Sequence, residues 1–240
     1  MIRKKIFGAL HHEQFRHRGD EILRIEALSD AVFAFSVSLL VAALEVPQTF
    51  EELTEIIAGG IPFFATVALV FLFWYQQYIY FRHYALNDAT TILINLLYLA
   101  LILFYIYPLK FLFSLLLMGF TGINLFPKAA AEGLPVLTQE QFPHLVLLFS
   151  VGYMLIWLLL YLMHVRAMSF ARELSLNAYE LLYTRKEKRG ALWNAQIGFT
   201  ALLLAITGIA WLSGLCYLFI PVVLIANEQL FKRQLKRLPK

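Results

Sequence analysis

The chain has few charged residues and a single cysteine. Charged side chains make up 15% of its 240 residues, while 60% are hydrophobic. A soluble domain of this composition would expose far too much apolar surface to water, which excludes an ordinary soluble protein. Cys216 stands alone in an apolar run, so no disulfide framework or cysteine metal site is expected. The first 26 residues lack an apolar core, and we therefore expect no cleavable signal peptide.

Residue patterns typical of enzymes are also missing. Catalysis would need paired histidines with a carboxylate, or an activated Ser or Cys. The closest pattern is His11-His12-Glu13 in the N-terminal tail, which we interpret as a segment without a metal. His144 and His164 lie at opposite ends of one apolar stretch, too far apart to act together. We expect neither enzymatic activity nor a cofactor.

Long apolar stretches dominate the rest of the sequence. A helix that crosses the bilayer needs about 20 apolar residues. Six stretches of this kind predict an all-α membrane protein with one six-helix transmembrane domain over residues 1–240. The predicted spans are 27–46, 60–81, 91–113, 142–164, 191–212 and 215–231. Pro108 inside the third span predicts a kink, and Lys110 lies near its outer end.

The positive charges are concentrated on one side of the predicted spans. Residues 1–24, 166–189 and 232–240 contain 17 of the 20 Lys and Arg residues, and Arg82 makes 18. Only Lys110 and Lys128 fall elsewhere. Because basic loops stay in the cytoplasm, we expect a multi-pass protein of the cell membrane with both termini cytoplasmic. The charge therefore relates to the bilayer, and we expect no nucleic-acid partner.

Two connecting segments have distinct patterns. Residues 166–190 alternate charges with apolar residues near helical spacing, which predicts an amphipathic helix lying on the membrane surface. Residues 119–141 are rich in Gly and Pro and predict an irregular outer loop. No repeat relates the first three spans to the last three, as many secondary transporters would require.

The first span has a narrow stripe along one helical face. At about 100° per residue, six positions spaced 4, 3, 4, 3, 4 fall within about 60° of one line. They are Arg24, Leu28, Ala31, Phe35, Ser38 and Ala42. Such spacing suits packing against copies of the same helix or lining a shared axis. Ser38 has two interpretations at this point: it lines a pore, or its hydroxyl bonds back to the carbonyl four residues earlier.

Polar residues at the start of this span lie off the stripe. Asp30 falls about 140° away on one side and Ser29 about 120° away on the other. An ionisable residue within a membrane span is costly and usually has a partner. Candidates at the same depth on the second and third spans are Trp74, Gln77 and Asn95. We expect these residues to brace the first span, and Arg24 to lie at the entrance of the shared axis.

The sequence Arg24-x-x-x-Leu28-Ser29-Asp30 resembles the R-x-x-x-F-S-D motif of prokaryotic potassium channels related to the lysosomal transmembrane protein 175. Six spans, cytoplasmic termini and the Trp74 stretch agree with that resemblance. It implies a homotetramer in the bilayer, with one central pore lined by the first helices. The motif residues and their partners Trp74, Gln77 and Asn95 would hold the helices around the pore.

The same resemblance assigns roles along the stripe. The narrowest hydrophobic point of the pore falls on Phe35, and the hydroxyl linked to cation preference falls on Ser38, near which potassium ions would pass. Ala42 is a further lining position, and we add Ala31 and Leu39. These positions largely coincide with the stripe found from helical spacing, and this favours the pore-lining interpretation of Ser38.

Three residues depart from the family pattern. Leu28 replaces the motif Phe and keeps an apolar side chain. Gln77 stands where relatives often have His, and Gln cannot become charged. Phe35 replaces an aliphatic residue, and four phenyl rings would close a narrow pore by dewetting unless they rotate aside. Proton sensitivity and gating therefore need not follow the relatives.

The predicted function is a passive, potassium-preferring cation channel. The chain contains no Thr-Val-Gly-Tyr-Gly sequence, which argues against a filter of backbone carbonyls. Selectivity would come from hydroxyls and a short hydrophobic neck, and we expect it to be modest. The alternative is a secondary transporter or proton-coupled permease that uses Asp30 and Glu228 as titrating groups.

Overall fold

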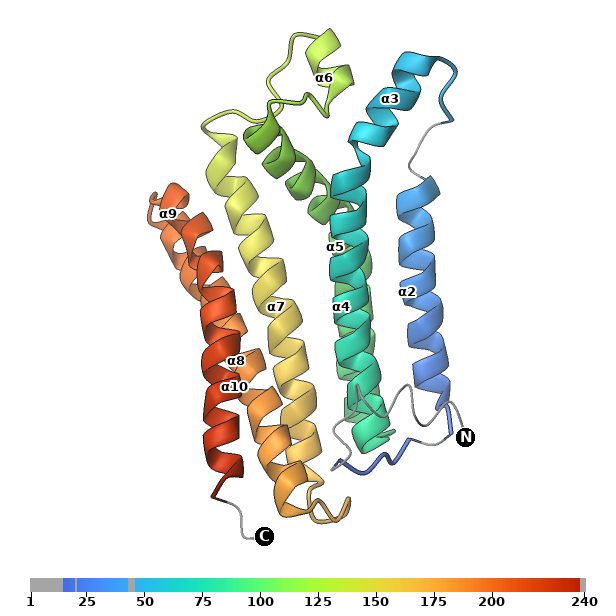
Figure 1. Ribbon diagram of the computed structural model, residues 1–240, viewed down its shortest axis with the longest axis vertical. Coiled ribbons are helices and arrows are strands. Elements are labelled where there is room, and N and C mark those ends of the chain that lie inside the picture. The colour runs from blue at the N-terminus through green and yellow to red at the C-terminus, as the bar shows by residue number, and fades with distance from the viewer. Residues whose placement is uncertain (1–14, 20, 43–45, 238–240) are drawn as a thin grey trace.

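The protein is all-helical over the residues that the structure, a computed structural model, describes. These are residues 15–19, 21–42 and 46–237, and their regular elements are all helices (Figure 1). The predicted all-α class is confirmed for this part of the chain. The tail sequence His11-His12-Glu13 lies outside the described residues, as do the terminal basic residues Arg3, Lys4, Lys5 and Lys240.

The first half of the bundle contains the predicted pore helix and two long helices packed against it. Its elements are α2 (Arg24–Ala42), α3 (Phe50–Ala58), α4 (Gly60–Tyr84) and α5 (Ala89–Thr121). α2 packs on both α4 and α5. Figure 1 shows the start of α2 at the same end of the bundle as the ends of α4, α7 and α10, and this end is called the basal end below.

The second half of the bundle is built around an antiparallel pair of long helices. Its elements are α6 (Pro127–Ala131), α7 (Gln141–Ser169), α8 (Ala178–Ile206), α9 (Ala210–Leu215), the 3-10 turn η1 (Cys216–Phe219) and α10 (Ile220–Leu235). α8 packs along α7 and α10, while α7 also packs on α5. Figure 1 shows the start of α2 and the end of α10 both at the basal end.

Five helical stretches among the described residues are long and apolar enough to cross a membrane. They are Arg24–Ala42, Phe50–Tyr84, Ala89–Thr121, Gln141–Ser169 and Leu212–Leu235. Each includes most of one predicted span. The predicted span 191–212 falls mainly on α8, which is not among the five. The first half of that helix is charged, and Asn194 and Gln196 interrupt its apolar second half.

The predicted surface helix over residues 166–190 is wrong. α7 continues to Ser169, and after a short turn α8 runs without a break from Ala178 to Ile206. Asn177 caps α8: its side chain accepts a hydrogen bond from the backbone N–H of Glu180, whose carboxylate bonds back to the Asn177 N–H. This capping box starts a helix well before the apolar residues begin.

Three further boundaries differ from the prediction. α8 ends at Ile206, six residues before the predicted end of the span, because Gly208 adopts a left-handed conformation with φ +83°. α5 continues through Pro108 to Thr121, eight residues beyond the predicted end. Figure 1 shows the part of α5 beyond the kink leaving α4 and leaning toward α7. Within the predicted outer loop, Pro127–Ala131 forms the short helix α6.

Candidate functional site

The candidate site is the exposed face of α2, which points away from α4 and α5. Residues Ser29, Phe33, Ser36 and Leu40 on one face of this helix are buried against its neighbours. The six positions of the predicted stripe are all exposed: Arg24, Leu28, Ala31, Phe35, Ser38 and Ala42. This stripe is mostly apolar and is exposed on the single chain. Large exposed apolar surfaces mark sites that contact lipid or another protein surface.

Phe35 and Ser38 lie one helical turn apart on this exposed face. Phe35 is 57% exposed, which is high for a large aromatic residue. The Ser38 hydroxyl donates a hydrogen bond of 3.0 Å to the carbonyl oxygen of Ala34, four residues earlier. That bond uses the only hydrogen of the hydroxyl and leaves both lone pairs of the oxygen able to face a cation. The back-bond and a pore-facing oxygen are therefore compatible.

Ser36 provides an internal comparison for Ser38. Its hydroxyl makes the same bond, 2.8 Å to the carbonyl of Val32, but Ser36 is fully buried on the opposite face. Leu39, which we predicted to line the pore, is only half-exposed. Its carbonyl accepts a 3.3 Å hydrogen bond from the Tyr107 hydroxyl of α5. Leu39 therefore lies at the edge of the stripe.

A chain of buried side chains joins the three helices of the first half. Gln77 Nε2 of α4 donates to Asn95 Oδ1 of α5 at 2.9 Å, and Asn95 Nδ2 donates to the Ser29 hydroxyl of α2 at 3.0 Å. Ser29 in turn donates to the Ile25 carbonyl at 2.7 Å. Each of the three side chains is at most 2% exposed. Buried hydrogen bonds between helices fix their relative position and rotation.

Asp30 has a separate partner on α4. The indole N–H of Trp74 donates to Asp30 Oδ1 at 2.7 Å. Such a charge-assisted bond is stronger than a neutral one. Arg24 is exposed at the start of α2, and its side chain has no hydrogen bond or ion pair with the described residues. The structure thus brings Asp30, Ser29, Trp74, Gln77 and Asn95 into contacts around the start of α2, and leaves Arg24 apart from them.

Several residues that hold this region were missed from the sequence. The segment of residues 15–19 packs on the basal end of the bundle and contacts α8 through Glu180. Asn177-x-x-Glu180 is a readable capping-box pattern and could have indicated where α8 begins. No sequence signal connects Arg18 to Glu180, which lies 162 positions away.

The described residues contain no group of side chains suited to holding a metal ion. No three His, Cys, Asp or Glu side chains within residues 15–19, 21–42 and 46–237 are grouped so as to hold a metal ion. His164 is buried in α7 with its Nδ1 2.8 Å from the Leu160 carbonyl, and His144 lies at the other end of the same helix. Neither histidine forms part of a catalytic arrangement with the other.

Comparisons with known proteins place the chain among potassium channels. Residues 24–105 match the family described as the endosomal/lysosomal potassium channel TMEM175. A potassium channel of Marivirga tractuosa is 34% identical over 219 residues, which is 88% of each chain. The crystal structure of a variant of the potassium channel MtTMEM175, bound to a nanobody fusion protein, superposes with a TM-score of 0.81. It shares 31% identity, and the match covers 93% of this chain and 99% of that one.

The fold and these relatives define a class: a multi-pass, all-helical membrane protein of the potassium channel type, and not an enzyme. The chain belongs to the TMEM175 potassium channel family. The matched residues begin at Arg24 and include Trp74, Gln77 and Asn95. They therefore contain the contacts that position α2.

Proposed function

We propose that the protein is a passive, potassium-preferring cation channel in which four α2 helices line one central pore. The observation that carries the proposal is the division of α2 into two faces. One face is buried on α4 and α5, and the other exposes the stripe from Arg24 to Ala42. A fourfold arrangement around the stripe would cover it with copies of itself. The relative from Marivirga tractuosa, named a potassium channel, supports the same function.

The proposed topology follows from the distribution of charge. Six passes would place the basal end, both termini and 18 of the 20 basic residues in the cytoplasm of a cell-membrane protein. α8 would be the least apolar of these passes, shielded from lipid by α7 and α10, on which it packs. We expect no cofactor other than the permeant ions.

Ions would meet a hydrophobic neck and a ring of hydroxyls. Four Phe35 rings would form the neck, and a neck of this kind conducts only when wide enough to hold water. Four Ser38 oxygens one turn further on would replace part of the hydration shell of K⁺. Because side-chain hydroxyls hold an ion less rigidly than a backbone-carbonyl filter, we expect only modest discrimination against Na⁺.

A coupled transporter is the competing function, and its two candidate carboxylates are both engaged. Asp30 accepts from Trp74 at 2.7 Å. Glu228 pairs with Lys186 at 2.9 Å and with Lys232 at 3.5 Å. Carboxylates that already have partners on neighbouring helices or side chains are suited to a structural role. The engagement of both carboxylates favours the channel over the coupled transporter.

The proposal is tested by measuring ion flux and reversal potential with purified protein in lipid bilayers. Wild-type protein in liposomes should pass K⁺ down its gradient without a proton gradient, whereas obligatory proton coupling would contradict the channel. Ser38→Ala should lower the K⁺-over-Na⁺ permeability ratio measured under bi-ionic conditions. Ser36→Ala is the matched control, since it removes the same back-bonded hydroxyl from the buried face. An unchanged ratio in Ser38→Ala would remove Ser38 from the ion path.

A further inference from the structure

The segment of residues 15–19, called the clamp below, is anchored on the basal end of the bundle just before α2. Phe15 is 3% exposed and stacks on His83 with ring centroids 3.9 Å apart. The backbone N–H groups of Arg18 and Gly19 donate to the Arg82 carbonyl at 3.1 and 3.3 Å. The Arg82 guanidinium donates back to the Gly19 carbonyl. The clamp is therefore held against the end of α4 by an aromatic stack and by hydrogen bonds to its backbone.

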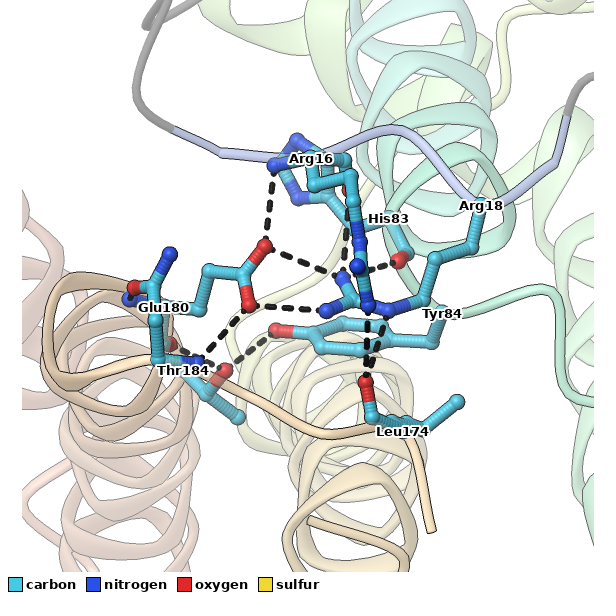
Figure 2. Close-up of polar contacts among 8 residues, drawn as sticks. Arg16, Arg18, His83, Tyr84, Leu174, Glu180 and Thr184 are labelled. Atoms are coloured by element: carbon cyan, nitrogen blue, oxygen red, sulfur yellow. Dashed lines mark hydrogen bonds and ion pairs between the residues drawn. The ribbon is translucent and has the colours of Figure 1, made fainter. Parts of the chain in front are cut away.

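Arg18 carries the clamp across to the second half of the bundle. Its guanidinium forms two hydrogen bonds with the Glu180 carboxylate, 2.7 Å from Nη2 to Oε2 and 3.1 Å from Nη1 to Oε1 (Figure 2). Its Nε donates to the Leu174 carbonyl at 3.1 Å. The two side chains are only 10% and 1% exposed. Removing one partner from such a buried pair leaves the other charge uncompensated and strongly destabilises the contact.

Glu180 serves the clamp and α8 at the same time. Besides Arg18, it accepts the backbone N–H of Arg16 at 2.9 Å and the backbone N–H of Asn177 at 3.0 Å. The second bond belongs to the capping box of α8. One carboxylate thus fixes both the first turn of α8 and the path of the clamp.

Gly19 has no room for a side chain. A Cβ at this position would lie 2.9 Å from the Phe81 carbonyl oxygen and 3.3 Å from Arg82 Cα, both backbone atoms that cannot turn aside. The close approach of the clamp to α4 therefore depends on glycine. A substitution here would lift the clamp without changing any charge.

We propose that the clamp is a positioning device for the channel gate: it ties the start of the pore helix to α8, and its release raises the open probability. This inference rests on the proposed function of α2 as the pore lining. No Cα atom of α2 lies within 8 Å of α7, α8 or α10 among the described residues. Gly19 precedes Arg24, the first residue of α2, by only five positions. The clamp is thus a direct route from the second half of the bundle to the pore helix.

Release of the clamp should raise the open probability, and not lower it, because of the hydrophobic neck. Closure by dewetting requires four Phe35 rings to stay close together, and so requires their helices to be held at fixed spacing. Loss of an anchor at one end of α2 allows the helix to shift and the neck to widen. Ser38 lies on the same helix beyond the neck, so its chemistry is unchanged and the permeability ratio should be unchanged too.

The experiment uses single-channel recording of the full-length protein in bilayers. Arg18→Gln, Glu180→Gln and Gly19→Ala should each raise open probability, by about 2- to 30-fold for couplings of this kind. Glu180→Gln retains a residue that suits the capping box, which separates the clamp from helix capping. Arg18→Lys keeps the charge but not the two-point bond, and should fall between wild type and Arg18→Gln. Arg172→Gln and Glu173→Gln are controls, because both residues are exposed in the turn before α8.

Outcomes for the clamp and for the channel are distinguishable. If wild-type protein gives no passive current, the proposed function fails. If wild type conducts but the three clamp variants match Arg172→Gln in open probability, or conduct less, only the clamp proposal is overturned. A changed reversal potential in these variants would also overturn it, because it would place their effect in the filter. Gel filtration checks that each variant retains the assembly state of the wild type.

Discussion

The helices within the first half of the bundle and those within the second half are packed together in different ways. In the first half, buried polar side chains join α2, α4 and α5 through Ser29, Asn95 and Gln77. In the second half, hydrogen bonds such as Tyr153 to Asn194 at 2.7 Å are combined with close approach of α7, α8 and α10 at glycines. A Cβ on Gly198 would lie 3.0 Å from the Cβ of Met154, and one on Gly190 would lie 2.7 Å from Asn227 Nδ2. Small residues permit close helix packing in membranes, and polar residues supply directed contacts.

The two kinds of contact constrain the helices differently. Close packing at glycines gives α7 and α8 one rigid arrangement. Hydrogen bonds fix the rotation of α2 from its buried side, so the stripe with Phe35 and Ser38 stays exposed. Polar contacts link the halves as well: Tyr105 of α5 donates to the Leu148 carbonyl, Tyr80 of α4 donates to the Met163 carbonyl, and Tyr84 of α4 bonds to Thr184 of α8. Asp88 also pairs with Arg166 at 2.9 Å, and the clamp pairs with Glu180.

The largest effect should come from forcing the close-packed pair apart. In Gly198→Leu, the new Cβ would lie 3.0 Å from both the Cβ and the backbone nitrogen of Met154, which leaves no room for the rest of the side chain. Overpacking of this kind costs about 1–3 kcal/mol, and we expect the upper end because a backbone atom must move. Thermal unfolding in detergent measures it. Gly119→Leu in α5 is the control, since no atom lies within 4 Å of its added Cβ, and it should be neutral or stabilising.

Breaking the polar network should cost somewhat less. Asn95→Leu leaves the Gln77 amide and the Ser29 hydroxyl without their shared partner in a buried site. An orphaned buried polar group costs about 1–3 kcal/mol. We expect a loss of about 2 kcal/mol in the free energy of unfolding, measured by denaturant titration. The rate of amide hydrogen exchange should rise more in α2 than in α8, relative to the wild type. Equal exchange increases in both helices would show that the two halves are not held separately.

Loss of the Trp74 contact should affect assembly more than stability. Asp30→Ala removes the acceptor for the indole N–H and should reduce the yield of assembled protein, measured by gel filtration. Asp30→Asn keeps an oxygen that can accept this bond and should restore assembly. If Asp30→Ala assembles normally but changes the permeability ratio, Asp30 lies in the ion path and not in the bracing of α2.

The smallest effect concerns acidification of the links at the basal end. Burial acts to raise the pKa of Glu180, but hydrogen bonds from Arg18 and from the Asn177 and Arg16 N–H groups outweigh it and lower the pKa. Burial likewise opposes the hydrogen bonds from Thr91 and Arg166 that lower the pKa of Asp88. Both depressed carboxyls stabilise the folded chain above their ordinary pKa of about 4, and lose this contribution as pH falls through the lowered values.

Thermal stability of the wild type should therefore be flat from pH 7 to about 5 and should decline below the ordinary carboxyl pKa. Glu180→Gln should show a weaker decline, because one of the two titrating carboxyls is gone. An identical decline in this variant would mean that Glu180 does not contribute to the pH dependence.

Sequence patterns predicted the two faces of α2 better than its surroundings. The stripe from Arg24 to Ala42 and the polar residues facing α4 and α5 follow from helical periodicity, which acts over a few residues. The clamp joins Arg18 to Glu180 across 162 positions, and no local pattern indicates such a contact. The continuous helix α8 was also missed, because its charged first half suggested a surface helix while its apolar second half suggested a span.

The most direct test of the pore assignment compares two serines on opposite faces of α2. In a Cys216→Ser background, Ser38→Cys and Ser36→Cys each introduce one thiol, and both native hydroxyls make the same back-bond. A charged thiol reagent should block the current of Ser38→Cys and leave that of Ser36→Cys unchanged. Block at Ser36, or equal modification at both positions, would contradict a pore lined by the exposed face of α2.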